Sequence, residues 1–404
     1  MNKRNLFLWS LYDFANSIVF INFLLYFSQW LVIDGGLSDF WYNATFPIST
    51  LLLLLTAPLL GAYTDKYGGR KWYLNISTIC VAVSYAVSTA LAYAHAHIVF
   101  VAIFFLLGQY FYQLCFVFYN PMIEEIADDS HRSRASGIGQ FSNALGQVFG
   151  LIIMLPLANP RLRPLFPAIG IFLVLALPMM ILYRENKPEK PAAKPGLLDE
   201  RLVYRKLFSF IILSASTPLL LAFFFYNDAL VTVTNNYSIY MERVLAVPDK
   251  TKSILLISIV VMNAIGGISA GWIGDRIGVL KTLLFTLIGW IICLPIIAYT
   301  DSLAVLAAMT VCIGLLIGAM WATSRAYMSK LLPSDQMGLG FSFYTLLERF
   351  ASFIGPLTWG GIISILGVNK TSYRIAMATM TVYVLTGLLI LAFWSRRPTP
   401  VSVS

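Results

Sequence analysis

The sequence is poor in charged and in reactive side chains. Of its 404 residues only 12% are charged, and it contains three histidines and four cysteines. No GxxxxGK phosphate loop, HExxH zinc motif or CxxC pair occurs in it. The four cysteines lie singly within apolar stretches, so their spacing supports neither a disulfide framework nor a metal site. The sequence therefore predicts a protein that is not an enzyme and that needs no cofactor and no metal.

Hydrophobic residues are abundant instead. They make up 58% of the chain, and the mean hydropathy of +0.76 is far above that of soluble domains. A membrane-spanning helix needs about 20 mostly apolar residues, and apolar runs of this length recur along the whole sequence. We expect an all-α integral membrane protein with twelve transmembrane helices, at residues 6–32, 41–63, 72–94, 98–120, 136–158, 165–183, 217–241, 253–274, 281–299, 303–328, 338–365 and 372–394.

The basic residues are distributed unevenly between the predicted spans. With the N-terminus placed inside, 20 Lys and Arg residues fall on the inner side and 7 on the outer side, and Arg349 remains within a span. Because Lys and Arg concentrate on the cytoplasmic side of membrane proteins, both termini are predicted to be cytoplasmic. The net charge of +9 then follows from topology, and no nucleic-acid partner is expected.

Only one connection between the predicted spans is long. Residues 184–206, RENKPEKPAAKPGLLDERLVYRK, follow the sixth span and are rich in Pro and Lys. This segment is predicted to be a cytoplasmic linker, with an interfacial helix that can extend to about residue 216. It divides the chain into two predicted six-helix bundles, 1–183 and 207–404.

One motif occurs in both halves, as GAYTDKYGGRK at 61–71 and GWIGDRIGVLK at 271–281. Each copy follows the second span of its half, which indicates a duplicated six-helix unit. The first glycine of each copy permits close helix approach, and the aspartate can accept hydrogen bonds from the amides at the start of a neighbouring helix. Such contacts can hold the inner side shut. The predicted gate residues are Gly61, Asp65, Arg70, Lys71, Gly271, Asp275, Arg276 and Lys281.

This pattern resembles the signature loop of the major facilitator superfamily. The resemblance covers essentially the whole chain once the span count, the inside termini and the central linker are included. It implies two pseudo-symmetric six-helix bundles that rock about a central site and so give alternating access.

Local motifs resemble a narrower group, the vacuolar amino-acid effluxers linked to autophagy and their bacterial relatives. The more specific of these motifs are WSLYDFANS at 9–17 and FFYNDAL at 224–230. The chain departs from the family pattern at Ala229, where a glycine is expected. Together with the short loops, the resemblance implies an amino-acid transporter of a bacterial inner membrane. The other motifs that carry it are YNPMIEEIA, RASGIGQFSNALGQVFG, SRAYMSKLLP and ERFASFIGP.

An aspartate lies inside the first predicted span. Asp13 is in the inner third of this span and shares a helix face with Tyr12 and Asn16. An ionised carboxylate at bilayer depth costs at least about 2.5 kcal/mol, so it normally faces protein or a water-filled cavity. The polar face of the first span is therefore predicted to look inward.

Asp228 is the counterpart of this aspartate in the second half, and it follows Tyr226 and Asn227. If its span begins near Leu207, Asp228 lies close to the outer surface. If the span begins at Thr217, it lies near the middle of the membrane. The spacing of the repeats favours the second alternative.

Other polar side chains fall on spans that line the cavity in the resembled fold. Amides of this kind can also be plain glue between helices, and for any single residue that interpretation is at least as good. The candidates are Gln109, Tyr112, Gln113, Asn120, Gln140, Asn143, Gln147, Arg325, Tyr344, Glu348 and Arg349.

Three roles are open for Asp13 and Asp228. Either can take up and release a proton as its exposure changes between two states, or bind a cationic group such as an α-amine. The third role is structural, as a static bridge to Arg325 or Arg349 or as a polar cap at a helix break. Arg349 can in turn bind a substrate carboxylate through two hydrogen bonds.

The sequence thus predicts a monomeric secondary transporter for a small polar solute. The predicted solute is an amino acid or a similar zwitterion, carried by alternating access and coupled to protons as a symporter or antiporter. Two alternatives stay open, namely a carrier for a sugar, nucleoside or lipid, and a membrane receptor or scaffold that keeps the fold without transport.

Overall fold

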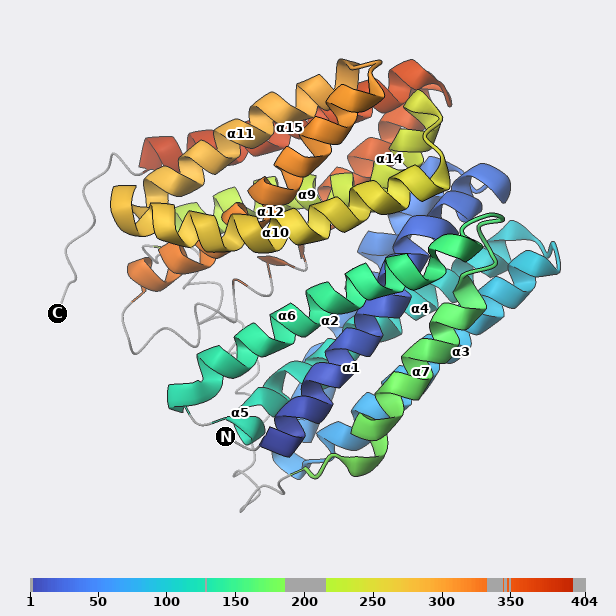
Figure 1. Cartoon of the computed structure of the whole chain (residues 1–404), viewed down its shortest axis with the longest axis vertical. Coiled ribbons are helices and arrows are strands. Elements are labelled where there is room, and N and C mark those ends of the chain that lie inside the picture. The colour runs from blue at the N-terminus through green and yellow to red at the C-terminus, as the bar shows by residue number, and fades with distance from the viewer. Residues whose placement is uncertain are drawn as a thin grey trace. The chain divides into compact units, whose positions relative to one another are not determined.

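The structure is a computed structural model that describes residues 3–127, 129–185, 216–332, 344, 347–348 and 350–394. Within these residues all regular elements are helices, and eleven helices are long and apolar enough to cross a membrane (Figure 1). Of the predicted span 338–365, the helix α14 at Ile354–Leu366 is described. The predicted all-α membrane fold is confirmed.

The described residues fall into two compact units, Met1–Ala192 with Val247–Ile257, and Ala193–Ala246 with Ser258–Ser404. The helices of the first half of the sequence belong to unit 1. In Figure 1, α1 lies between α6 and α7, and it packs against both. The bounds are α1 Lys3–Asn22, with the π-helical turns η1 Phe23–Phe27 and η2 Trp30–Asp34 after it, α2 Asp39–Tyr67, α3 Arg70–Tyr93, α4 Ile98–Tyr119, η3 Asn120–Met122, α5 Ile123–Ile126, α6 Asp129–Met154, η4 Leu155–Leu157 and α7 Leu165–Leu182.

The second half of the sequence forms unit 2, apart from the start of one helix. Here α9 packs against α12, α14 and α15, and α11 packs against α12 and α15. The bounds are α9 Thr217–Leu245, α10 Asp249–Ile277, α11 Val279–Tyr299, α12 Leu303–Leu331, α14 Ile354–Leu366 and α15 Lys370–Trp394. Because α9 begins at Thr217, Asp228 lies in the interior of its helix, as the second alternative predicted. Residues 186–215, which include most of the predicted linker, are outside the described residues.

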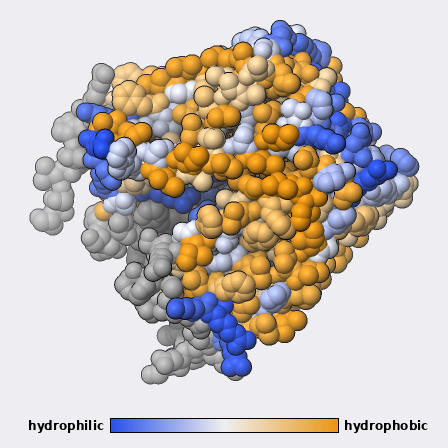
Figure 2. All heavy atoms as spheres, viewed as in Figure 1, coloured by the Kyte–Doolittle hydropathy of each residue, from blue (hydrophilic) through white to orange (hydrophobic). Residues whose placement is uncertain are grey.

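The surface of the helices is apolar. Figure 2 shows hydrophobic residues over much of the visible face. Large apolar side chains stand out from the helices, for example Leu55 and Ile181, which are 69% and 66% exposed. Such a surface is costly in water and suits the hydrocarbon of a bilayer.

Glycines set the closest helix contacts. On α6, a Cβ at Gly146 would overlap the carbonyl oxygen of Phe14 on α1, and one at Gly150 would lie 3.1 Å from the Cα of Ile18. On α12, a Cβ at Gly318 would overlap the carbonyl oxygen of Asn263 on α10. Small residues allow helix backbones to approach in this way inside membranes.

The close approach expected at the two motif glycines is not found. A Cβ at Gly61 would have its nearest neighbour, a Val117 methyl, at 4.0 Å, and at Gly271 no described heavy atom lies within 4 Å. On α10 the close approach lies instead at Gly266, where a Cβ would overlap the carbonyl oxygen of Leu315 on α12.

Candidate functional site

Asp13 is bound by an amide chain from α6. The Asp13 side chain is 6% exposed, and its Oδ1 accepts a hydrogen bond of 2.9 Å from Nδ2 of Asn143. Asn143 in turn accepts a hydrogen bond of 2.7 Å from Nε2 of Gln147, one turn along α6. The carboxylate of α1 and two amides of α6 therefore form one continuous polar chain across the pair of helices.

Aromatic rings flank this carboxylate on the same unit. Trp9, one turn before Asp13, stacks on Tyr119 of α4 with the ring centroids 4.6 Å apart. The Trp9 indole donates to the Tyr119 carbonyl at 3.1 Å, and the Tyr119 hydroxyl donates to the Trp9 carbonyl at 3.0 Å. Further along α1, Phe20 stacks on Tyr112 at 5.0 Å. The rings are thus held in fixed positions by α4.

Asn16 is the exceptional residue of this face. It lies one turn after Asp13 and is fully buried, and neither of its amide atoms has a hydrogen-bond partner among the described residues. Leaving a buried polar group unsatisfied costs about 1–3 kcal/mol, and such groups in native structures call for an explanation. Tyr12, by contrast, shares a hydrogen bond of 2.8 Å with Thr78 of α3. The fold therefore satisfies Tyr12 and leaves Asn16 able to bind a further polar group.

Asp228 makes a different kind of contact. Its side chain is fully buried, and its Oδ2 accepts a hydrogen bond of 2.7 Å from the backbone N–H of Gly355, at the start of α14. A carboxylate at this position satisfies amides that the first turn of a helix leaves free. A Cβ at position 355 would overlap the Thr232 hydroxyl and lie 2.9 Å from Oδ1 of Asp228. Asp228 therefore anchors α14 closely on α9.

The neighbours of Asp228 are also engaged with other helices. The Tyr226 hydroxyl shares a hydrogen bond of 2.7 Å with Ser324, and Asn227 accepts one of 3.3 Å from the Trp321 indole. Both contacts join α9 to α12. Tyr226, Asn227 and Asp228 on α9 thus connect this helix to α12 and α14.

The remaining candidates lie in several places, and of these Asn143 and Gln147 belong to the hydrogen-bonded chain at Asp13. Gln113 donates to Ser49 of α2 at 3.0 Å and joins α4 to α2. Gln109 and Tyr344 are buried, Glu348 is half-buried, Asn120, Gln140 and Arg325 are exposed, and Arg349 is outside the described residues.

The first copy of the repeated motif is held within unit 1. Oε1 of Glu185 accepts hydrogen bonds of 2.8 Å from the backbone amides of Gly69 and Arg70, and Oε2 accepts one of 3.1 Å from that of Lys71. The Lys71 ammonium donates to the carbonyls of Ile181 and Tyr183 at the end of α7. The sequence predicts a carboxylate at a helix start, and at the start of α3 Glu185 supplies one.

A second carboxylate supports this end of the bundle. Arg70 lies 3.5 Å from Glu125, which also accepts a hydrogen bond from the Tyr183 hydroxyl. Burial raises the pKa of Tyr183, so this hydroxyl keeps its proton and remains a donor. The Asp65 side chain is outside the described residues.

The second copy has a different setting. Asp275, Arg276 and Lys281 are exposed, and the Arg276 guanidinium lies 3.7 Å from the centre of the Trp272 ring. The two copies therefore share their sequence pattern without sharing their described contacts.

Sequence reasoning missed a polar network between the π-helical turns that follow α1 and the start of α10. Its charged members are Asp34, Arg161, Asp249 and Lys252. The available signal was the presence of opposite charges beside the ends of three different predicted spans. Hydropathy alone gives no means of pairing them.

Comparisons with known proteins find matches along nearly the whole chain. The family model described as Major Facilitator Superfamily matches residues 9–267 and 219–404. The uncharacterised MFS-type transporter YxiO of Bacillus subtilis strain 168 is 24% identical, over 95% of this chain and 93% of its own length.

Two solved structures share the fold. A mutant of the nucleoside transporter NupG matches with a TM-score of 0.78 at 11% identity, over 96% of this chain and 99% of that chain. A bacterial homolog of the human lysosomal transporter Spinster matches with a TM-score of 0.73 at 14% identity, over 97% of this chain and 96% of that chain. At these identities the likeness concerns the fold alone.

Proposed function

Because the chain belongs to the major facilitator superfamily, we propose that it is a secondary transporter for a small solute with a cationic amino group, an amino acid or a similar zwitterion. The proteins it resembles in sequence and structure are transporters and not enzymes. In the proposed cycle the two halves of the sequence, 1–183 and 207–404, are the moving bundles, and 184–206 connects them on the cytoplasmic side.

The single observation that carries the solute class is the group around Asp13. A carboxylate beside fixed aromatic rings suits an ammonium group, which gains both a charge-assisted hydrogen bond and a cation–π contact. Asn16, one turn along the same face, has a donor and an acceptor that the described residues leave unused. The amide donors of Asn16 and Gln147 can bind the carboxylate of a zwitterion once the site opens.

We assign proton coupling to Asp13 rather than to Asp228. The partner of Asp13 is a side-chain amide, which can rotate away when a proton or an amine arrives. The partner of Asp228 is the backbone amide of Gly355, which cannot leave without moving α14. Asp13 therefore can exchange its partner during a transport cycle at low cost.

The test is uptake into vesicles, with and without an inward proton gradient, after a thermal-shift screen of amino acids, nucleosides, sugars and peptides. We expect amino acids or other zwitterions to raise the melting temperature, and the gradient to accelerate their transport. Asp13→Asn should abolish the response to the gradient, while Asp228→Asn should keep it because an amide oxygen still accepts the Gly355 N–H.

Asp301→Asn serves as the matched control, since Asp301 is exposed between α11 and α12. An unchanged gradient response in Asp13→Asn would refute the coupling role. A protein that responds to no solute in the panel would instead favour the receptor or scaffold alternative.

A nucleoside or sugar is the second candidate solute. The stacked pairs Trp9–Tyr119 and Phe20–Tyr112 favour it, because flat rings and sugar faces pack well on aromatic side chains. A thermal shift with nucleosides or sugars and none with amino acids would select this alternative.

A further inference from the structure

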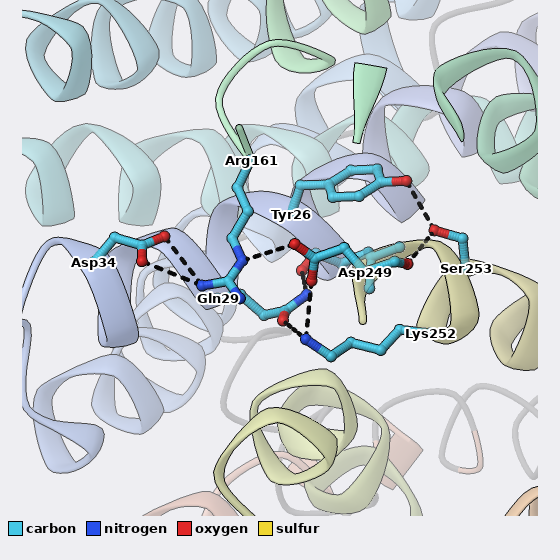
Figure 3. A network of polar contacts seen from close by, with 8 residues as sticks. Tyr26, Gln29, Asp34, Arg161, Asp249, Lys252 and Ser253 are labelled. Carbon is cyan, nitrogen blue, oxygen red and sulfur yellow. Dashed lines mark hydrogen bonds and ion pairs between the residues drawn. The ribbon is translucent and has the colours of Figure 1, made fainter. Parts of the chain in front are cut away.

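A network of polar contacts joins the π-helical turns η1 and η2, which follow α1, to the start of α10 (Figure 3). We name it the latch. All of its members belong to unit 1. They are Tyr26, Gln29, Asp34, Arg161, Asp249, Lys252 and Ser253.

Lys252 is the most enclosed charge of the latch. Its side chain is 0% exposed, and its Nζ lies 2.8 Å from Oδ1 of Asp249. It also donates a hydrogen bond to the side-chain oxygen of Gln29. The Gln29 amide nitrogen donates to the Leu25 carbonyl at 2.7 Å, which turns the Gln29 oxygen toward Lys252. A buried ammonium is tolerated only where partners of this kind replace its hydration.

Arg161 joins the two acidic members. Its NH1 lies 3.2 and 3.1 Å from the two carboxylate oxygens of Asp34, and its Nε donates to Oδ2 of Asp249 at 3.1 Å. Asp249 thus binds Arg161 through one oxygen and Lys252 through the other. The two cations and two anions balance, and the loss of one member leaves the others incompletely paired.

The latch also has an uncharged contact between the two helices. The hydroxyls of Tyr26 and Ser253 share a buried hydrogen bond of 2.8 Å. On the α1 side, Tyr26, Gln29 and Asp34 lie within or between the π-helical turns η1 and η2. Such turns are rare and frequently occur at functional positions.

The helix that the latch holds is shared between the units. Residues 247–257 belong to unit 1 and the chain from Ser258 onward belongs to unit 2, yet α10 is one helix from Asp249 to Ile277. The latch therefore fixes the first two turns of a helix whose remainder belongs to the other unit.

We propose that the latch stabilises one of the two states of the transport cycle, by holding the start of α10 in unit 1, and that it opens when the transporter passes to its other state. The inference rests on the proposed function, because a cycle with two states is what alternating access requires. A ligand or a substitution shifts such an equilibrium only through contacts that differ between the states, and the latch is a set of such contacts.

The test is hydrogen exchange of the full-length protein, measured by mass spectrometry on peptides that cover 23–34 and 249–257. In Lys252→Met, Asp249 keeps Arg161 as its partner, so we expect the fold to survive. Loss of the buried cation should accelerate exchange in both segments about tenfold, within the usual range of couplings between sites. Lys250→Met is the matched control, because Lys250 is an exposed lysine two residues away, and it should exchange like the unmodified protein.

Tyr26→Phe provides a milder second variant that removes a single hydroxyl. It should accelerate exchange in the same two segments by a smaller factor. If Lys252→Met fails to fold, Tyr26→Phe decides alone. Exchange rates equal to those of Lys250→Met in every folded latch variant would overturn the proposal. The measurement uses no solute, so its outcome is independent of whether transport of an amino acid is found.

Discussion

At the residue scale, the two buried aspartates differ in how easily their hydrogen-bond partners can move away. Asp13 accepts a hydrogen bond from the side chain of Asn143, and rotation of that side chain removes this bond without moving a helix. Asp228 is bound to the backbone of Gly355 at the first turn of α14. Two carboxylates in corresponding helices therefore differ in their partners, a side-chain amide for Asp13 and a backbone amide for Asp228.

A stability measurement separates these two roles. Asp228→Ala removes the acceptor for the Gly355 amide, and we expect the free energy of unfolding to fall by about 1–2 kcal/mol, as for the loss of a helix cap. Asp228→Asn keeps an oxygen acceptor and should lose less. Chemical unfolding in detergent measures both, with Asp13→Ala as the comparison. Equal stability of Asp228→Ala and the unmodified protein would show that the cap contributes nothing.

Residue identities in the site were accessible from the sequence, but their partners were not. Tyr12, Asp13, Asn16 and Asn143 stand out as polar residues in apolar runs, because their cost in a membrane is independent of the fold. The contact between Asp13 and Asn143 joins residues 130 positions apart. The partner of Asp228 is a backbone amide, which every residue except proline possesses and which no side-chain pattern can indicate.

At the scale of the elements, helix positions follow from apolar length. The predicted runs 72–94, 98–120 and 303–328 agree closely with α3 at Arg70–Tyr93, α4 at Ile98–Tyr119 and α12 at Leu303–Leu331. The agreement has a simple cause. In hydrocarbon the backbone must satisfy its own hydrogen bonds, so a long apolar run is a helix.

The start of α10 was predicted too late, at residue 253 instead of Asp249. Asp249 and Lys252 read as loop residues because they are charged. In the structure they lie within the helix because the latch pairs them with Arg161 and Gln29. A hydropathy pattern counts each charge as exposed, and it fails where charges neutralise one another across distant segments.

Helix packing on α6 yields a prediction with a built-in control. Gly146→Ala places a methyl group against the carbonyl of Phe14, which belongs to a backbone that cannot move aside easily. We expect a loss of about 1–3 kcal/mol in the free energy of unfolding, as for overpacked cores. Gly271→Ala on α10 meets no described atom within 4 Å, and it should gain about 0.5–1 kcal/mol because alanine favours a helix. Thermal and chemical unfolding in detergent measure both changes. A change of stability in the same direction for both variants would contradict this prediction.

At the scale of the whole molecule, the duplication seen in the sequence recurs within each unit. In unit 1 the aspartate of the first span contacts α6, the fifth span of its half. In unit 2 the aspartate of the seventh span contacts α14, which lies in the fifth span of the second half. The helix pair is kept while the chemistry of the contact differs. The two halves thus place a carboxylate at the corresponding pair of helices and give it a different partner in each.

The orientation of the molecule in the membrane gives the last prediction. With both termini inside, 20 Lys and Arg residues lie on the inner side and 7 on the outer side, and the positive-inside rule selects this orientation. We expect green fluorescent protein fused to the C-terminus to fluoresce, and alkaline phosphatase fused there to be inactive. Two further fusions of alkaline phosphatase, after residue 160 and after residue 185, form a matched pair, because these positions lie on the two sides of α7. Activity is expected only for the fusion after residue 160. The reverse pattern would place the latch, which contains Arg161, on the cytoplasmic side, and the Glu185 contact with α3 on the outer side.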